Sequence, residues 1–450
     1  MRSRLAVAVL VASIAIPASS YQISTWIPPW DPTGLSSVQS NARNMDESNP
    51  VWYSLNASGA VVKNWNAEDQ NLRAAMTGTR IVPTIQNYVD GRFNGPLVAS
   101  LLSTSAGRET HAEELTRLAV MNAFDGIDID YEGLPATARL DFTSFVSVLS
   151  SKLHGAGKKL SVTVHAKTSD TQNWNGPGSQ DWVSIGNLAD SVKIMSYDYH
   201  WSTSDAGEIA PLAWLESVAG YAASVMPAAK IMMGIPWYGY DWQGRVGKTV
   251  VHKSALALAA ANGAVVSHTA GGEATFNYAD HVVYFQDAIS YSRKVDAITN
   301  KVPGIGGFAH WLSGAEDPLV WQKVAQIRSI NSGGSGGTAP AGTFEVTGPQ
   351  SVTVAPKASV KAIYSVVNIN GFSSPIDVKV ESIDALPGSV TLSATRVAPG
   401  QPVSLTVTAN SKAGAGNYRL NVRFTSGTIE KTQLLTVTVS SSPRGRAAKR

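Results

Sequence analysis

The segment Phe124-Asp125-Gly126-Ile127-Asp128-Ile129-Asp130-Tyr131-Glu132-Gly133 decides the fold of this chain and points to its chemistry. Its side chains alternate between apolar and acidic, which is the pattern of a β-strand. One face of that strand carries the carboxyl groups of Asp128, Asp130 and Glu132. Because neighbouring anions disfavour a further charge, Glu132 at the end of the row is expected to hold a proton near neutral pH and to serve as an acid.

An exposed strand face or a metal site would also account for these carboxyl groups. The flanking residues are strongly apolar and contain glycine, which argues against an exposed face. No His or Cys joins the run, and alternate carboxylates on a strand diverge too far to share one cation. The sequence therefore predicts neither a metal nor a cofactor.

The composition limits the classes of function. With 450 residues, the chain is long enough for one large barrel and a small second domain. Charged residues make up 15%, the formal net charge is +3, and no basic stripe precedes the tail, so a nucleic-acid partner is not expected. The chain has no Cys, which excludes disulfides, a zinc knuckle and a thiol nucleophile.

The first 20 residues have the pattern of an export signal. Arg2 and Arg4 precede an apolar core from Leu5 to Ile16, and small residues for cleavage follow at positions 17–20. The core is too short to span a bilayer, and no later segment has the length of a membrane helix. A cytosolic amphipathic start is the alternative. We expect a signal peptide over residues 1–20 and a secreted, soluble, monomeric mature protein.

Residues 21–330 alternate apolar strand-like runs with helix-like segments. About eight such repeats predict an α/β fold of the (β/α)8 TIM-barrel type. A doubly wound open sheet is the other possibility, but no glycine-rich phosphate loop follows the first strand. The segment between Tyr238 and Gly304 reads as a small insertion with strand character over 274–288, which favours a shallow site.

The composition changes at residues 331–342, which form a linker rich in Gly and Ser. Short alternating strands follow over residues 343–441 and predict a small all-β immunoglobulin-like sandwich. This domain has no Trp, and its aromatic residues lie mostly in alternating strands, so core packing is expected of them. We expect it to serve as a spacer or in cell-wall or cell-surface attachment. Residues 442–450 form a basic tail.

Aromatic, amide and acidic residues gather where the predicted barrel strands end. The active site of such a barrel lies at the carboxyl ends of its strands. Sugars need flat aromatic surfaces together with polar groups for their hydroxyls. The residues at these ends are Trp26, Trp30, Trp52, Tyr53, Gln86, Asn87, Asp130, Glu132, Tyr197, Asp198, Trp237, Tyr238, Trp242 and Trp311.

The spacing of the carboxyl groups constrains the mechanism. Asp130 and Glu132 are same-face neighbours, roughly 6.6–7 Å apart along a strand. They would approach a sugar from one side, whereas the usual pair of catalytic carboxylates flanks it. A nucleophile within the substrate would resolve this conflict.

These residues resemble a known family. Phe124 to Glu132 is similar to the D-x-x-D-x-D-x-E signature of the family 18 glycoside hydrolases, the chitinase family, with every acidic position filled. Three later motifs are also similar to that family: Met195 to Asp198, Gly234 to Gly239, and Trp311. Further motifs resemble its spore-germination and cortex-lytic branch: 52–56, 198–201 and 316–318. His165, Tyr240 and His310 depart from that branch, and no LysM-type repeat is visible.

The resemblance implies substrate-assisted, retaining hydrolysis of β-1,4 bonds in polymers that contain N-acetylglucosamine. It implies that Glu132 is the general acid and that the substrate's acetamido carbonyl attacks the anomeric carbon. Asp130 would hold the acetamido N–H and share a proton or hydrogen bond with Asp128. Tyr197 would donate to the acetamido oxygen, and Asp125 would support the strand. Sugar contacts would come from Asp198, Trp311, Tyr238, Trp52 and Trp26.

Other functions remain open at this point. Peptidoglycan and N-linked glycans contain the same sugar, so an endo-N-acetylglucosaminidase is one alternative. Some members of the family are lectins without activity, and these typically lose the acid that Glu132 supplies here.

Overall fold

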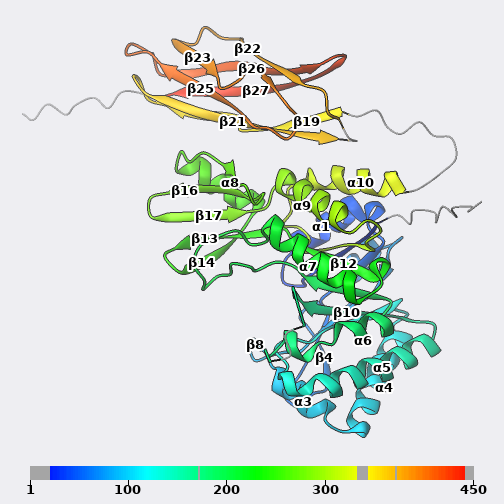
Figure 1. Cartoon of the computed structure of the whole chain (residues 1–450). Helices are drawn as coiled ribbons and strands as arrows, with labels where there is room; N and C mark the ends of the chain where they lie inside the picture. The colour runs from blue at the N-terminus through cyan, green and yellow to red at the C-terminus, as the bar shows by residue number, and fades with distance from the viewer. Residues whose placement is uncertain (1–20, 171–172, 332–342, 370–371, 441–450) are drawn as a thin grey trace, which may run out of the picture.

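The computed structural model describes residues 21–170, 173–331, 343–369 and 372–440 (Figure 1). The predicted signal peptide, the linker beyond Asn331 and the basic tail lie outside the described residues. Within the described part of the chain, no helix is both long enough and apolar enough to cross a membrane.

Parallel strands form a closed ring in the first domain, as predicted for a TIM barrel. Two of the eight ring positions are split, because β2 pairs with β5 while their continuations β3 and β6 pair with each other. These pairings close the ring between β1 and β9. In the described residues the barrel strands are β1 (Gln22–Ile27), β2 (Glu47–Pro50) with β3 (Tyr53–Leu55), β5 (Arg80–Ile81) with β6 (Thr84–Gln86), β9 (Gly126–Asp130), β10 (Lys159–His165), β11 (Ser191–Met195), β12 (Ile231–Pro236) and β18 (Gly307–Trp311).

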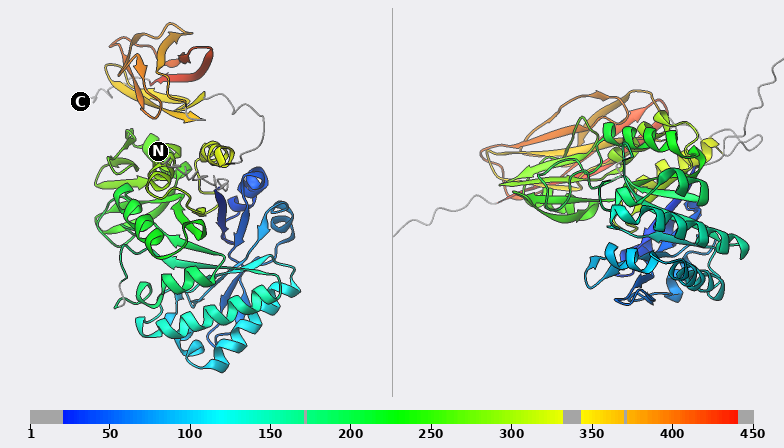
Figure 2. Two further views of the ribbon diagram at one scale, coloured as in Figure 1. Left: turned by 45° about the vertical axis from the view of Figure 1, so that its right-hand side comes forward. Right: turned by 60° about the horizontal axis from the view of Figure 1, so that its bottom comes forward.

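Helices surround this ring and bury the outward-facing side chains of the strands (Figure 2). On β9, Ile127 and Ile129 have no exposed surface and belong to the main core, together with Phe145 and Leu149 of α5. The alternation of the strand then turns Asp128 and Asp130 to the inside of the barrel. The helices are α1 (Thr33–Asn41), α2 (Gln70–Ala75), α3 (Gly95–Leu102), α4 (Ser105–Met121), α5 (Arg139–Gly155), α6 (Trp182–Leu188), α7 (Leu212–Val225), α9 (Ala288–Lys301) and α10 (Val320–Asn331).

The insertion after β12 is a folded unit and not the small addition that the sequence predicted. In the described residues it is a five-stranded sheet in the order β14-β13-β17-β16-β15, with helix α8 (His252–Ala261). It has its own apolar core, which includes Phe276, Val283 and Phe285. The predicted strand character over 274–288 corresponds to β16 and β17, whereas Ala288 begins helix α9. The strands are β13 (Tyr238–Gln243), β14 (Val246–Val251), β15 (Ser267–His268), β16 (Ala274–Tyr278) and β17 (His281–Phe285).

The C-terminal domain consists of two sheets that enclose one core. Among the described residues, one sheet has the order β19-β21-β25-β23 and the other β20-β27-β26-β22-β24. Tyr364 and Phe424 come from different sheets, and their ring centroids lie 5.7 Å apart. The strands are β19 (Thr343–Thr347), β20 (Ser351–Val354), β21 (Ser359–Ile369), β22 (Ile376–Ser382), β23 (Gly388–Leu392), β24 (Arg396–Val397), β25 (Val403–Ala409), β26 (Gly416–Ser426) and β27 (Ile429–Val439).

Three short elements complete the barrel domain. β4 (Val61–Lys63) extends β3 as an antiparallel hairpin, and β7 (Tyr88–Val89) pairs with β8 (Arg92–Phe93).

Asp125 precedes β9, and its carboxylate accepts the backbone N–H of Ile81 at 2.7 Å. This bond confirms the structural role expected of Asp125.

Candidate active site

Asp128 lies inside the barrel, where polar groups from several strands surround its carboxylate. Trp26 Nε1 donates to Oδ2 at 3.1 Å, and Thr84 Oγ1 donates to the same oxygen at 2.8 Å. Ser161 Oγ donates to Oδ1, and Thr163 Oγ1 lies 3.2 Å from both oxygens. Both oxygens are thus occupied, which fixes the carboxylate in place.

A lysine that the sequence reasoning missed balances this negative charge. Lys193 on β11 has no exposed surface, and its Nζ lies 3.3 Å from Asp128 Oδ1 and 2.9 Å from Glu47 Oε1. It also donates to Ser161 Oγ at 3.0 Å. A buried ammonium group needs anionic partners, and Lys193 has two. An apolar strand pattern interrupted by Lys193 was the available signal.

Asp130 occupies the next position toward the mouth of the barrel. Its Oδ2 accepts a hydrogen bond from Gln86 Nε2 at 2.8 Å, whereas its buried Oδ1 has no partner among the described residues. Burial, opposed by the Gln86 hydrogen bond and assisted by the nearby Asp128 anion, raises the pKa of Asp130 to about 7. The expected hydrogen bond between Asp128 and Asp130 is not among those that the described residues make.

Glu132 follows directly after β9 and is held by its backbone. Asn87 receives the Glu132 N–H at 2.8 Å and donates to the Glu132 carbonyl at 2.8 Å. This pair of hydrogen bonds fixes the backbone from which the carboxyl group projects. Burial and the charges of Asp130 and Asp198 raise its pKa well above the usual value. This direction agrees with the expectation from the carboxylate row, although burial is the largest cause.

Tyrosines border the far side of this row. The ring of Tyr197 meets the ring of Tyr238 edge-on at 6.1 Å. Burial and the surrounding carboxylates raise the pKa of Tyr197 well above 10, so its hydroxyl remains a donor. Asp198 Oδ1 accepts hydrogen bonds from Tyr238 at 2.6 Å and Tyr240 at 3.1 Å. Both phenols come from β13 of the insertion, so the insertion sheet helps to build the site.

The predicted tryptophan contacts differ in where their rings lie. Trp311, at the end of β18, is half-buried and packs edge-on against Trp26 at 6.3 Å. Trp26 and Tyr238 are buried and bind the carboxylates of Asp128 and Asp198 through their N–H and O–H groups. Trp52 has no exposed surface and packs on Phe124 in the main core. Trp52 is therefore a core residue, and the prediction that it contacts sugar is wrong.

Exposed aromatic side chains also occur in several segments that follow strands of the barrel domain. Sequence reasoning placed only Trp30 among the residues at the strand ends, and it named Tyr199 and Trp201 only within the motif 198–201. These exposed side chains share a position after the carboxyl end of a strand and at least 45% exposure. They are Trp30, Trp65, Tyr88, Trp174, Tyr199 and Trp201. Trp65 follows the antiparallel hairpin strand β4, and the others follow the carboxyl ends of the barrel strands β1, β6, β10 and β11, a place that could have identified them.

Comparisons with known proteins agree with this geometry. Residues 63–316 match the sequence profile of Glycosyl hydrolases family 18. The chain is 28% identical over 262 residues to the Cortical fragment-lytic enzyme of Bacillus anthracis, a match that covers 56% of this chain and 60% of that enzyme's length.

Two solved structures extend the comparison. The chitinase from Chromobacterium violaceum superposes with a TM-score of 0.64 at 28% identity, over 68% of this chain and 99% of that one. Chitinase ChiW from Paenibacillus sp. str. FPU-7 superposes with a TM-score of 0.62 over 93% of this chain and 56% of that one. Because its identity is only 16%, that likeness concerns the fold. The chain belongs to family 18 of the glycosyl hydrolases.

Proposed function

We propose that this protein is a secreted hydrolase of β-1,4-linked N-acetylglucosamine polymers, with chitin or its oligosaccharides as substrate. The observation that carries the proposal is the row of Asp128, Asp130 and Glu132 inside the barrel mouth. Its members differ in their surroundings, because Asp128 lies 3.3 Å from Lys193 whereas burial raises the pKa values of Asp130 and Glu132. One face therefore offers a carboxyl group paired with a lysine and two carboxyl groups that burial helps to hold protons.

Glu132 is the general acid in this mechanism. Its raised pKa keeps a proton available near neutral pH, and the Asn87 clamp holds its backbone while the carboxyl group faces the site. The proton passes to the glycosidic oxygen as the bond to the anomeric carbon breaks. The same carboxylate then accepts a proton from the water that completes hydrolysis.

The substrate's acetamido group supplies the nucleophile. Asp130 ends β9 and Glu132 follows two residues later, so both approach the sugar from one side. The unpartnered Oδ1 of Asp130 is suited to accept the acetamido N–H, which orients the carbonyl oxygen toward the anomeric carbon. Tyr197 donates to that oxygen, Asp198 binds a sugar hydroxyl, and Trp311 forms the floor beneath the ring.

A polymer containing N-acetylglucosamine suits the wider surface of the domain. Exposed tryptophans and tyrosines follow the ends of four barrel strands and offer stacking surfaces to further sugars. Likeness to a chitinase supports chitin, and likeness to a cortical fragment-lytic enzyme makes peptidoglycan the second candidate. In this proposal the C-terminal domain is an immunoglobulin-like sandwich for cell-surface attachment, and the protein acts as a monomer.

A side-by-side assay of polymers tests the proposal. Chitin oligosaccharides, purified peptidoglycan, an N-glycosylated protein and fully deacetylated chitosan are incubated with the wild type and with Glu132→Gln. We expect release from chitin oligosaccharides, no cleavage of chitosan, and a loss of several orders of magnitude in kcat for the variant because the acid is gone.

Each alternative predicts a different result in the same assay. Release from peptidoglycan alone would move the substrate to the cell wall. Efficient cleavage of chitosan would contradict the acetamido mechanism. Tight binding of chitin oligosaccharides without cleavage would identify a lectin.

A further inference from the structure

His165 is a titratable group beside the catalytic row that the mechanism above does not use. It ends β10, the neighbour of β9, and its Nε2 lies 4.0 Å from Glu132 Oε2. Nε2 itself is buried and has no hydrogen-bond partner among the described residues. Buried ring nitrogens are normally paired, so this nitrogen requires an explanation.

The surroundings hold the imidazole against Glu132. The backbone N–H of His165 donates to Gln180 Oε1 at 2.8 Å. Gly176 adopts a φ of +78° and lies so close that a Cβ there would stand 2.7 Å from His165 Nε2. The ring is therefore enclosed between Gly176 and the carboxyl group, and only a residue without a side chain leaves it that space.

Burial favours a neutral imidazole. Glu132 faces it from the segment after β9, and Lys167 faces it from its own chain segment, while its register partner on β11 is the uncharged Met195. Lys167 Nζ donates to the Gln180 carbonyl at 2.6 Å and lies 3.4 Å from Asp170. Burial, with a smaller contribution from Lys167, lowers the pKa of His165 to about 4. A neutral imidazole has one N–H donor and one acceptor nitrogen.

We propose that His165 is a positioning residue for Glu132. The Nε2–H of His165 donates to Oε2 of Glu132 as the carboxyl group of Glu132 gives up its proton. This inference rests on the proposed function of Glu132 as the acid. Occupying Oε2 leaves the transferable proton on Oε1. That proton passes to the glycosidic oxygen as the C–O bond breaks, and His165 retains its own proton throughout.

The contact stabilises the transition state more than the resting enzyme. An N–H donor binds a carboxylate more strongly than a neutral carboxylic acid, and Glu132 becomes negative only during proton transfer. The 4.0 Å separation in the free enzyme must shorten by about 1 Å, and such catalytic hydrogen bonds are often long before substrate binds.

Three substitutions separate a donor from a space-filling role. His165→Gln keeps an N–H near the place of Nε2, His165→Asn has its N–H near the place of Nδ1, and His165→Leu has none. For Leu and Asn we expect kcat on a chitin oligosaccharide to fall about tenfold with KM within about twofold. The alkaline limb of the pH profile should move up by about 0.5–1 unit, because the ionised Glu132 loses its donor. His165→Gln should restore both values to within about threefold.

A matched control, His154, lies on helix α5 near the other end of β10. His154→Leu removes an imidazole that binds Asp190 at 2.8 Å near the start of β10. This variant should leave the pH profile unchanged. Equal profiles for the wild type and all three His165 variants would overturn the proposal, as would a Gln variant that behaves like Leu.

An optical titration decides the question without turnover. The infrared C=O stretch of protonated Glu132 is identified as the band that Glu132→Gln lacks. Its titration midpoint should rise in His165→Leu and not in His165→Gln. If the wild type cleaves none of the polymers, the proposed function fails, yet this titration still supports or overturns the contact between His165 and Glu132.

Discussion

The buried carboxyl group of Asp130 lowers the free energy of unfolding when it is ionised. Its carboxyl group is 5% exposed and has a pKa of about 7, against about 3.9 in an unfolded chain. The folded protein therefore binds more protons than the unfolded protein between these pH values. By linkage, the free energy of unfolding falls as the pH rises from about 4 to 7.

Asp130→Asn removes this titration and should change the pH dependence of stability. Near pH 4 the wild type and the variant should differ least. The difference in the free energy of unfolding, variant minus wild type, should be about 2 to 4 kcal/mol more favourable to the variant at pH 8 than at pH 4. The reason is that the wild type buries an anion at pH 8. Urea unfolding at both pH values measures this, with Asp128→Asn as a comparison that breaks the contact with Lys193 instead. The same offset at pH 4 and pH 8 would contradict the pKa assignment.

Strands and helices could be predicted from the sequence where a pattern of apolar and polar residues repeats. Positions set by contacts between distant parts of the chain could not. Alternation placed Asp128 and Asp130 on the inner face of β9, with Glu132 just beyond the end of the strand, and the repeat of strand and helix predicted the barrel. Lys193 and its pairing with Glu47 could not be predicted, because Glu47 and Lys193 are distant in sequence and meet only inside the closed ring. The prediction that Trp52 contacts sugar was wrong because a place near the end of a strand does not reveal whether a side chain points into the site or into the core.

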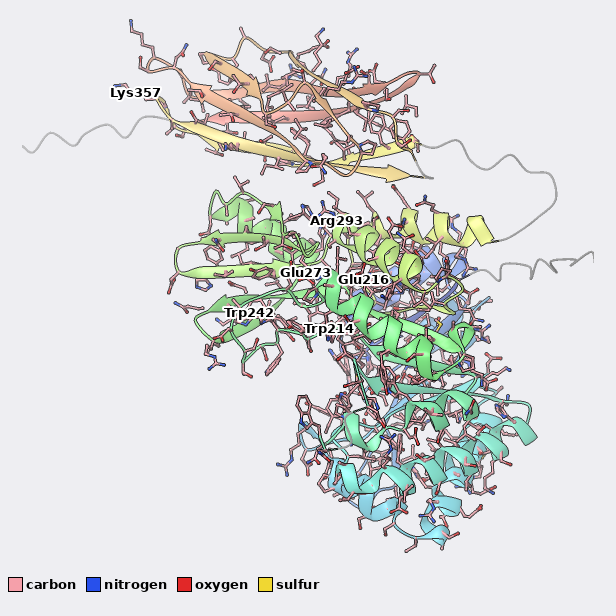
Figure 3. All side chains as sticks on the ribbon, viewed as in Figure 1. Trp214, Glu216, Trp242, Glu273, Arg293 and Lys357 are labelled. Carbon is pink, nitrogen blue, oxygen red and sulfur yellow. The ribbon has the colours of Figure 1, made fainter. Side chains whose placement is uncertain are left out.

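The size and structural role of the insertion were underestimated for a similar reason. The contacts that join it to the barrel are made by residues distant in sequence. Glu273, just before β16, is fully buried and accepts the backbone N–H groups of Ile209 and Ala210 at 2.8 and 2.6 Å (Figure 3). Lys294 of α9 lies 3.2 Å from the same carboxylate. Because the Ile209 carbonyl accepts the Tyr199 N–H, this contact stabilises the loop that begins with Asp198.

Glu273→Ala should therefore destabilise the barrel and weaken substrate binding together. It leaves the Lys294 ammonium buried without its partner, a change that typically costs about 3–5 kcal/mol. Urea unfolding gives the stability, and KM on a chitin oligosaccharide should rise because the loop with Asp198 loses its support. Asp377→Ala is the control, since its pair with Arg396 is exposed and contributes less than about 1 kcal/mol. Equal stabilities of the two variants would show that the buried pair does not hold the insertion.

At the scale of the whole molecule, the C-terminal domain lies over α8, α9 and α10 (Figures 1 and 2). A cavity of about 970 Å³ lies between the two domains. Its walls include His252, Leu256 and Asp317 from the barrel side and Val352 and Ile363 from the sandwich. Well-packed interiors have few voids larger than a water molecule, so these surfaces do not interlock. The carboxylates of the catalytic row are not among the residues that line it.

Truncation after Asn331, the end of α10, should therefore leave catalysis intact. The barrel, the insertion and every residue to which we assign a catalytic role precede that point, and the barrel has its own core. We expect kcat and KM on a soluble chitin oligosaccharide to stay within about twofold of the full chain, roughly 0.4 kcal/mol. The truncated protein with Glu132→Gln serves as the inactive control, and circular dichroism checks folding. A tenfold loss in a well-folded truncated protein would mean that residues after Asn331 contribute to the site, and the proposed independence of the barrel would be wrong.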